Sequence, residues 1–288
     1  MTETRAASEH AVPGVAALHR TERRRPGQLC VDRSLAARAG APRSSALRRV
    51  FGGSPVGVAE RAVFEAARGE RRVGRALDGL PTRWIVFHSL PCVGASGDID
   101  HVVVGPAGLF AITTRSITGD RAVVTEDELL NRGERVPFGR SAAAATRRTA
   151  RLAGSALPAE LGVRSVLVVA GAHPVRLRFR ARPIEVRDAR SVRAWLEALP
   201  PVLEDHDVRR IGVRIAKSFE ANADPVALAA DATSAGAVRA SLFARLEREV
   251  DAARRIRLLW RGVGSAALAV GLWASFTQLP ALLAGQVG

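Results

Sequence analysis

The first periodic stretch of the chain spans residues 57–78, where apolar side chains recur every three to four positions. This spacing predicts an amphipathic helix that ends near Gly79. Apolar, strand-like runs follow and predict three strands, at residues 83–89, 98–104 and 109–115. The sequence Gly105-Pro106-Ala107-Gly108 between the last two runs predicts a hairpin turn.

Helices and strands continue to alternate after the hairpin. Residues 141–157 have a helical pattern, and residues 165–170 form an apolar run typical of a strand buried on both faces. A short strand at 184–187, a helix at 189–199 and a helix starting after Asp205 complete the series. We therefore expect one α/β domain over residues 53–219, with the order helix, three-strand meander, helix and strand.

The segments that flank this domain have different patterns. Residues 1–52 are rich in Ala, Ser, Pro and Gly and carry many more arginines than acids, which predicts a mostly disordered basic arm. Residues 220–236 are rich in Ala, Asp, Ser and Gly and predict a linker. Residues 237–261 predict an amphipathic helix, with Arg and Glu on its polar face.

The end of the chain, from residue 262 onward, has no charged residue. Its length predicts a transmembrane helix over residues 262–284, and the alternative is a buried C-terminal helix. Arginines at the start of this stretch predict a single-pass membrane protein whose N-terminal domain faces the cytoplasm. Ala267, Gly271 and Ser275 form a row of small residues that could pack against a second copy, which predicts a homodimer.

The composition narrows the possible chemistry. The net charge is +15, with 43 basic and 28 acidic residues, which predicts a partner that carries phosphate, either nucleic acid or anionic lipid. The chain has no tyrosine and only two cysteines, which excludes a tyrosyl nucleophile, an iron–sulfur site of the ferredoxin type and a disulfide framework. No Walker-type phosphate loop is present.

One acidic residue of the first predicted helix is out of pattern. Glu70 falls four residues after Ala66 and three before Val73, which places its carboxylate on the apolar face. A carboxylate buried there needs a partner, because burying an unpaired charge is costly. The alternative is a position at the edge of the apolar stripe, or a salt bridge to Arg71 or Arg75.

The predicted hairpin brings further polar residues together. A turn at Pro106-Ala107 pairs Asp100 with Thr113 and Asp98 with Arg115, and the period-two alternation of side chains places all four on one face of the sheet. Two acids, a hydroxyl and a guanidinium in otherwise apolar strands indicate a functional cluster. The alternative is a simple ion pair between Asp98 and Arg115 on a solvated face.

These motifs resemble those of a known family. Gly69-Glu70, the run from Gly97 through Asp98-Ile99-Asp100-His101 and Gly105-Pro106 to Thr113-Thr114-Arg115, and Gly119 are similar to the nuclease-related domain (NERD). That domain is a branch of the PD-(D/E)XK nuclease superfamily. The resemblance covers residues 57 to about 175, with a weaker continuation to about residue 216. It implies a restriction-endonuclease-like core.

The resemblance also implies metal-assisted phosphodiester hydrolysis. In active relatives, a helix carboxylate, the hairpin Asp and the acid of an acid-x-Lys triplet hold Mg²⁺, and the lysine acts near the scissile phosphate. The matching positions here are Glu70, Asp100, Thr113 and Arg115. Glu70 and Asp100 are the expected metal ligands, for Mg²⁺ or Mn²⁺.

Two of the four positions depart from the family pattern. Thr113 brings no charge to a hard cation that prefers carboxylate oxygens, so we expect weak metal binding. Arg115 stays protonated and is no base, although it can still stabilise phosphoryl charge. The helix after the hairpin offers Ser141 and a run of alanines where relatives often carry polar residues.

Three hypotheses follow from the sequence. The first is a membrane-tethered NERD protein that binds nucleic acid, DNA before RNA, with a degenerate site of weak or no nuclease activity. The second is a working Mg²⁺- or Mn²⁺-dependent nuclease. The third is a membrane-anchored interaction module without enzymatic activity.

Overall fold

The computed structural model describes residues 18, 21, 24–40, 50–91, 98–117, 122–131, 133–171, 175–177, 184–222 and 234–284. The chain divides into two compact units. The first consists of Met1–Leu35 and Ala62–Ala240, and the second of Ala36–Arg61 and Ser241–Gly288. The candidate site lies in the first unit.

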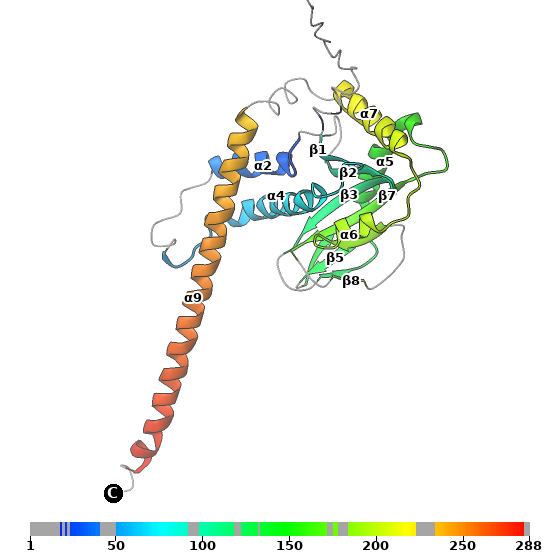
Figure 1. Ribbon diagram of the computed structural model, residues 1–288. Helices are drawn as coiled ribbons and strands as arrows, with labels where there is room; N and C mark the ends of the chain where they lie inside the picture. The colour runs from blue at the N-terminus through cyan, green and yellow to red at the C-terminus, as the bar shows by residue number, and fades with distance from the viewer. Residues whose placement is uncertain are drawn as a thin grey trace, which may run out of the picture. The chain divides into compact units, whose positions relative to one another are not determined.

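A five-stranded mixed sheet forms the centre of the first unit (Figure 1). Its first three strands form an antiparallel meander, and the remaining two continue the sheet in parallel from the third. In spatial order the strands are β1 (Ile85–Leu90), β2 (Ile99–Gly105), β3 (Gly108–Ser116), β7 (Val163–Ala170) and β9 (Ile184–Asp188). The predicted α/β fold with a sheet core is confirmed.

Helices cover both faces of this sheet, because each face is lined by apolar side chains. One face packs against α4 (Val58–Leu77), through residues such as Val73, and against α6 (Val192–Glu197). The other face packs against α5 (Gly139–Ala153) and α7 (Asp205–Asn222). A short 3-10 helix, Gly154–Ala156, follows α5. The order helix, meander, helix and strand is therefore present.

A second, smaller sheet has no counterpart in the sequence-based interpretation. It contains four short strands in the spatial order β6 (Glu134–Pro137), β5 (Glu128–Asn131), β4 (Ala122–Val124) and β8 (Val175–Leu177). These strands are three or four residues long, which is too short for a clear alternation of apolar and polar positions. Leu129 and Val124 pack with Leu167 and Val169 of β7 in a common apolar cluster.

The hairpin between β2 and β3 has the predicted register, from Gly105↔Gly108 to His101↔Ile112. Two glycines are needed at its turn. Gly108 has φ +117°, which favours glycine. A Cβ on Gly105 would lie 2.0 Å from the Trp84 ring, so only glycine lets the tryptophan pack flat against the turn.

Part of the predicted disordered arm is ordered. Helix α2 (Gln28–Ala39) forms within residues 1–52, so the prediction of disorder is wrong over this stretch. Its side chains Gln28, Val31 and Ser34 are buried, and this tertiary packing stabilises a segment that its composition alone does not. Much of the predicted linker lies outside the described residues, between the end of α7 and Ser234.

The predicted juxtamembrane and transmembrane helices form one continuous helix, α9 (Ser234–Ala284). Among the helices of the described residues, none combines the length and the apolar character that crossing a membrane requires. The prediction of a single-pass membrane protein is therefore wrong. The physical reason is that the tail lacks charge but is diluted by Gly, Ala, Ser and Gln residues, and absence of charge is not the same as high hydropathy.

The predicted homodimer is not supported either, because it depended on packing of Ala267, Gly271 and Ser275 inside a bilayer. Within the second unit, α9 instead packs against the segment before α4. The Trp260 indole N–H donates to the Val50 carbonyl at 3.0 Å, and its ring lies 5.3 Å from that of Phe51.

Candidate functional site

Helix α4 carries Glu70 across the ends of two strands. Gly69 makes this possible, because a Cβ there would lie 2.8 Å from the Ser116 Cβ at the end of β3 and 3.4 Å from that of Ala170 at the end of β7. The glycine therefore lets the helix approach the sheet closely. The next residue, Glu70, is buried, as its position on the apolar face predicted.

Asp100 lies where β2 and β3 separate. The recorded β2–β3 pairs end at His101↔Ile112, so the expected pairing of Asp100 with Thr113 is not part of the ladder. The Thr114 backbone N–H instead donates to Asp100 Oδ2 at 2.6 Å. The carboxylate thus accepts a hydrogen bond that a backbone carbonyl would accept in a continued β2–β3 ladder. It lies at the point where the two strands separate.

The surroundings of both carboxyl groups disfavour negative charge. Burial, followed by the charge of Asp100, raises the pKa of Glu70 to about 8. Burial also raises the pKa of Asp100 to about 6, against the lowering effect of the Thr114 hydrogen bond. The charge of Asp100 therefore acts on Glu70, and ionisation of one of these acids disfavours ionisation of the other.

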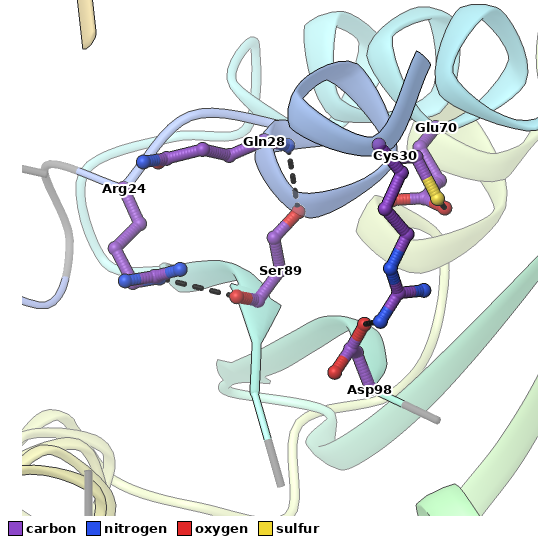
Figure 2. A network of polar contacts seen from close by, with 7 residues as sticks. Arg24, Gln28, Cys30, Glu70, Ser89 and Asp98 are labelled. Carbon is purple, nitrogen blue, oxygen red and sulfur yellow. Dashed lines mark hydrogen bonds and ion pairs between the residues drawn. The ribbon is translucent and has the colours of Figure 1, made fainter. Parts of the chain in front are cut away.

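Two residues of α2 contact this acidic group, and sequence reasoning missed both (Figure 2). The Cys30 thiol donates to Glu70 Oε1 at 3.0 Å. Burial is the main cause that raises the pKa of this thiol, so it stays protonated. Arg33 pairs with Asp98 Oδ2 at 3.1 Å. The alternative of an ion pair between Asp98 and Arg115 is therefore not what these described residues form.

Arg115 turns toward α5. Its guanidinium donates to the Thr114 carbonyl at 2.8 Å and to the Ser141 hydroxyl. It lines a surface hollow of about 510 Å³ together with Arg140 and Ser141. Arg115 therefore lies in the wall of this hollow, on the α5 side of the site, with its guanidinium hydrogen-bonded to the protein.

Thr113 is buried in β3 and pairs with Leu167 of β7 in the parallel ladder. Alternation of side chains places it on the same sheet face as Leu109 and Ala111, which pack in the cluster under α5 and α7. It contributes a hydroxyl and no charge to the position where the family pattern has an acid.

These side chains do not fit a divalent cation in the arrangement described. Within the described ranges, no group of three or more His, Cys, Asp or Glu side chains is placed to hold a metal. Glu70 Oε1 and Asp100 Oδ2 each accept a hydrogen bond from the protein, and the third family position is neutral. Mg²⁺ is usually held by one or two carboxylates together with several waters, so a cation here would have to replace these hydrogen bonds.

A second polar group lies on the α4 side of the sheet. His88 Nε2 is 2.9 Å from Asp78 Oδ1, and His88 Nδ1 is 2.8 Å from His101 Nδ1. Burial, followed by the neighbouring His88, lowers the pKa of His101 well below its usual value. The geometry assigns a chain in which neutral His101 donates to His88, and His88 donates to Asp78. No sequence motif indicated this chain, because the three residues come from different elements.

Comparison with protein families finds a match over part of the chain. Residues 65–170 match the family described as NERD, nuclease-related domain. The chain contains a nuclease-related domain. The matched range runs from α4 to the end of β7 and so includes Glu70, Asp100, Thr113 and Arg115. The comparisons with curated proteins and with solved structures gave no match.

Proposed function

We propose that this NERD protein binds nucleic acid and that its site is a degenerate form of a metal-dependent nuclease site, with weak or no hydrolytic activity. One observation carries the proposal. The charge of Asp100 contributes to the raised pKa of the buried Glu70, while the third family position holds the neutral Thr113. A site that keeps Glu70 and Asp100 but has no acid at the third position favours nucleic-acid binding over phosphodiester hydrolysis.

The positive charge supports nucleic acid as the partner. The chain carries +15, and arginine forms bidentate contacts with phosphate. Arg115 and Arg140 line the same hollow, whose lining also includes the acids Asp127 and Glu128. A phosphate seated in this hollow would be bound by guanidinium groups and by the Ser141 hydroxyl, with no base required.

Binding is tested with the full chain and fluorescein-labelled DNA and RNA of equal length. We expect affinity to fall at least about tenfold between 50 and 200 mM salt, because released counterions make phosphate binding salt-dependent. Arg115→Ala weakens binding, and Arg193→Ala, which removes an exposed arginine of α6 paired with Glu197, is the matched control. An affinity independent of salt contradicts the proposal, and the same assay compares DNA with RNA.

The degenerate site is tested by incubating plasmid DNA with the full chain and Mg²⁺ or Mn²⁺. We expect no cleavage, or slow cleavage that Asp100→Ala abolishes. Fast, metal-dependent cleavage that Asp100→Ala removes would support the alternative, a working Mg²⁺- or Mn²⁺-dependent nuclease.

A further inference from the structure

We propose that a cavity between α2, α4 and the start of α9, here called the arginine pocket, binds a phosphomonoester, either a small molecule or the phosphorylated end of a nucleic acid. The pocket has a volume of about 180 Å³, and its lining residues all belong to the first unit. They are separate from Glu70, Asp100 and Arg115. The inference therefore goes beyond the proposed function and does not rest on it.

Positive side chains reach this pocket from three segments that lie far apart in the sequence. The lining includes four guanidinium groups and two carboxylates, which leaves an excess of two positive charges. The guanidinium groups belong to Arg25 before α2, Arg71 and Arg75 of α4, and Arg239 of α9. Like charges around one cavity repel one another, and an anion bound among them removes that repulsion.

Both carboxylates of the pocket have partners within the protein. Asp32 Oδ1 lies 2.9 Å from Arg239 Nε. Asp78 Oδ1 lies 2.9 Å from His88 Nε2. One arginine and one histidine thus accompany the two acids, and the positive excess falls on the other three arginines.

Two of these three arginines are exposed and lie on different segments. Within the described part of the chain, neither Arg25 nor Arg75 forms an ion pair. Arg75 Nε donates to the Arg71 carbonyl at 3.3 Å, and this contact uses only one of its three guanidinium nitrogens. Both side chains therefore keep donors for an anion, and guanidinium groups match phosphate oxygens well.

The size and charge of the pocket indicate the class of ligand. Its volume is below the roughly 300–1,000 Å³ of pockets that enclose a drug-sized molecule, so the bound group is small. A phosphomonoester carries a charge of about −1.5 to −2 at neutral pH and three terminal oxygens, which matches the excess of two positive charges. A carboxylate or a backbone phosphodiester carries a single charge and matches it less well.

Two further features of the lining suit such a ligand. Pro26, Val31 and Ala240 provide apolar contacts for the group that is esterified to the phosphate. Gly236, in the first turn of α9, also lines the pocket, and this turn contains no acid. The first N–H groups of a helix have no partner inside it, so their partial positive charge adds to that of the arginines.

The first experiment measures binding of inorganic phosphate to the full chain by isothermal titration calorimetry at constant ionic strength. We expect Arg25→Gln and Arg75→Gln each to weaken binding by about tenfold, because hydrogen bonds between charged groups are among the stronger ones in proteins. Arg72→Gln is the matched control. It removes an exposed arginine of the same helix that does not line the pocket and leaves binding unchanged.

Absence of saturable phosphate binding overturns the proposal. Equal affinity of the unaltered chain and Arg75→Gln also overturns it. Weaker binding in only one of the two pocket variants does the same, because the proposal requires both segments to contact one anion. Agreement between Arg25→Gln and Arg75→Gln separates a binding effect from a local change in either segment.

A second titration uses Arg115→Ala, because the proposed function also seats a phosphate in the hollow at Arg115. Phosphate binding that persists in Arg115→Ala and is weakened by Arg75→Gln supports the arginine pocket, even if the chain binds no nucleic acid. Binding that Arg115→Ala abolishes and Arg75→Gln leaves intact overturns the arginine pocket and leaves the proposed function standing.

A third titration identifies the source of the phosphate group. It compares methyl phosphate with a trinucleotide that carries a terminal phosphate and with the same trinucleotide without it. Tighter binding of the phosphorylated trinucleotide than of the other two, lost in Arg75→Gln, supports the pocket and assigns it to nucleic-acid ends. Tighter binding of methyl phosphate, lost in the same variant, supports the pocket and assigns it to a free small molecule. Binding of the trinucleotide that does not depend on its terminal phosphate, together with no binding of methyl phosphate, overturns the proposal.

Discussion

Glu70 is buried against a thiol and near a second carboxylate, and its protonation is therefore linked to stability. A carboxyl group whose pKa is raised in the folded state binds a proton more tightly there than in the unfolded chain. Its contribution to stability is complete below the ordinary pKa of 4.5 and is lost as pH rises through about 8. Stability is lost because ionising the Glu70 carboxyl group in a buried, poorly solvated position costs free energy.

The substitution Glu70→Gln keeps the size of this side chain and an oxygen for the Cys30 thiol but removes the charge. We expect the variant to have the same free energy of unfolding as the unaltered chain at pH 4, below the ordinary pKa of a glutamate. At pH 8.5 it is more stable by at least about 1 kcal/mol, since one pKa unit corresponds to about 1.4 kcal/mol. Urea unfolding at both pH values measures the difference.

The matched control for this prediction is Glu160→Gln, which neutralises an exposed carboxylate of the first unit. It leaves the pH profile of stability unchanged. If Glu70→Gln and Glu160→Gln behave alike at pH 8.5, burial of Glu70 does not govern the pH dependence.

At the scale of elements, the β2–β3 hairpin positions the site, because its register fixes where the two strands separate. The turn depends on close packing between Gly105 and Trp84, and Trp84 in turn lies near Phe110 in the cluster beneath α4 and α6. A change at the turn therefore acts on the core as well as on the loop.

Substituting Gly105→Ala places a methyl group 2.0 Å from a Trp84 ring atom. Protein interiors relax only partly around added volume, so we expect a loss of about 1–3 kcal/mol in the free energy of unfolding. Gly162→Ala, at a position where a Cβ would meet no atom within 4 Å, is the control and changes stability little. Equal stability of the two variants would contradict the packing argument.

At the scale of the whole molecule, the net charge of +15 attracts the protein to polyanions such as nucleic acid. Attraction of this kind is long-ranged, falls with salt and depends on phosphate spacing. Contacts between arginine and phosphate fix position but carry no information about bases. The proposed binding is therefore expected to be nearly independent of sequence.

This expectation is tested with two DNA duplexes of equal length and unrelated sequence, in fluorescence anisotropy at the same salt concentration. Their dissociation constants should agree within about threefold, because phosphate contacts supply most of the non-specific affinity. A difference of a hundredfold or more would show direct reading of base edges, which the proposed function does not contain.

The sequence by itself determined the central elements of the sheet domain and the register of the hairpin, because both follow from neighbouring residues. Helical spacing identified α4, and the turn residues between β2 and β3 set their pairing. It also placed Glu70 on the buried face of its helix, since one polar residue in an apolar stripe is visible without coordinates. Local motifs also indicated the resemblance to the nuclease-related domain, which residues 65–170 match.

Tertiary structure alone decided the partners of the site residues. Asp98 pairs with Arg33, which lies 65 residues away along the chain, because α2 packs near the site. The hydrophobic pattern of α2 does not indicate where this helix packs. Arg115 faces Ser141 because the strands separate before reaching it. Such contacts depend on how elements pack in space, and a pattern that repeats over a few residues carries no information about that packing.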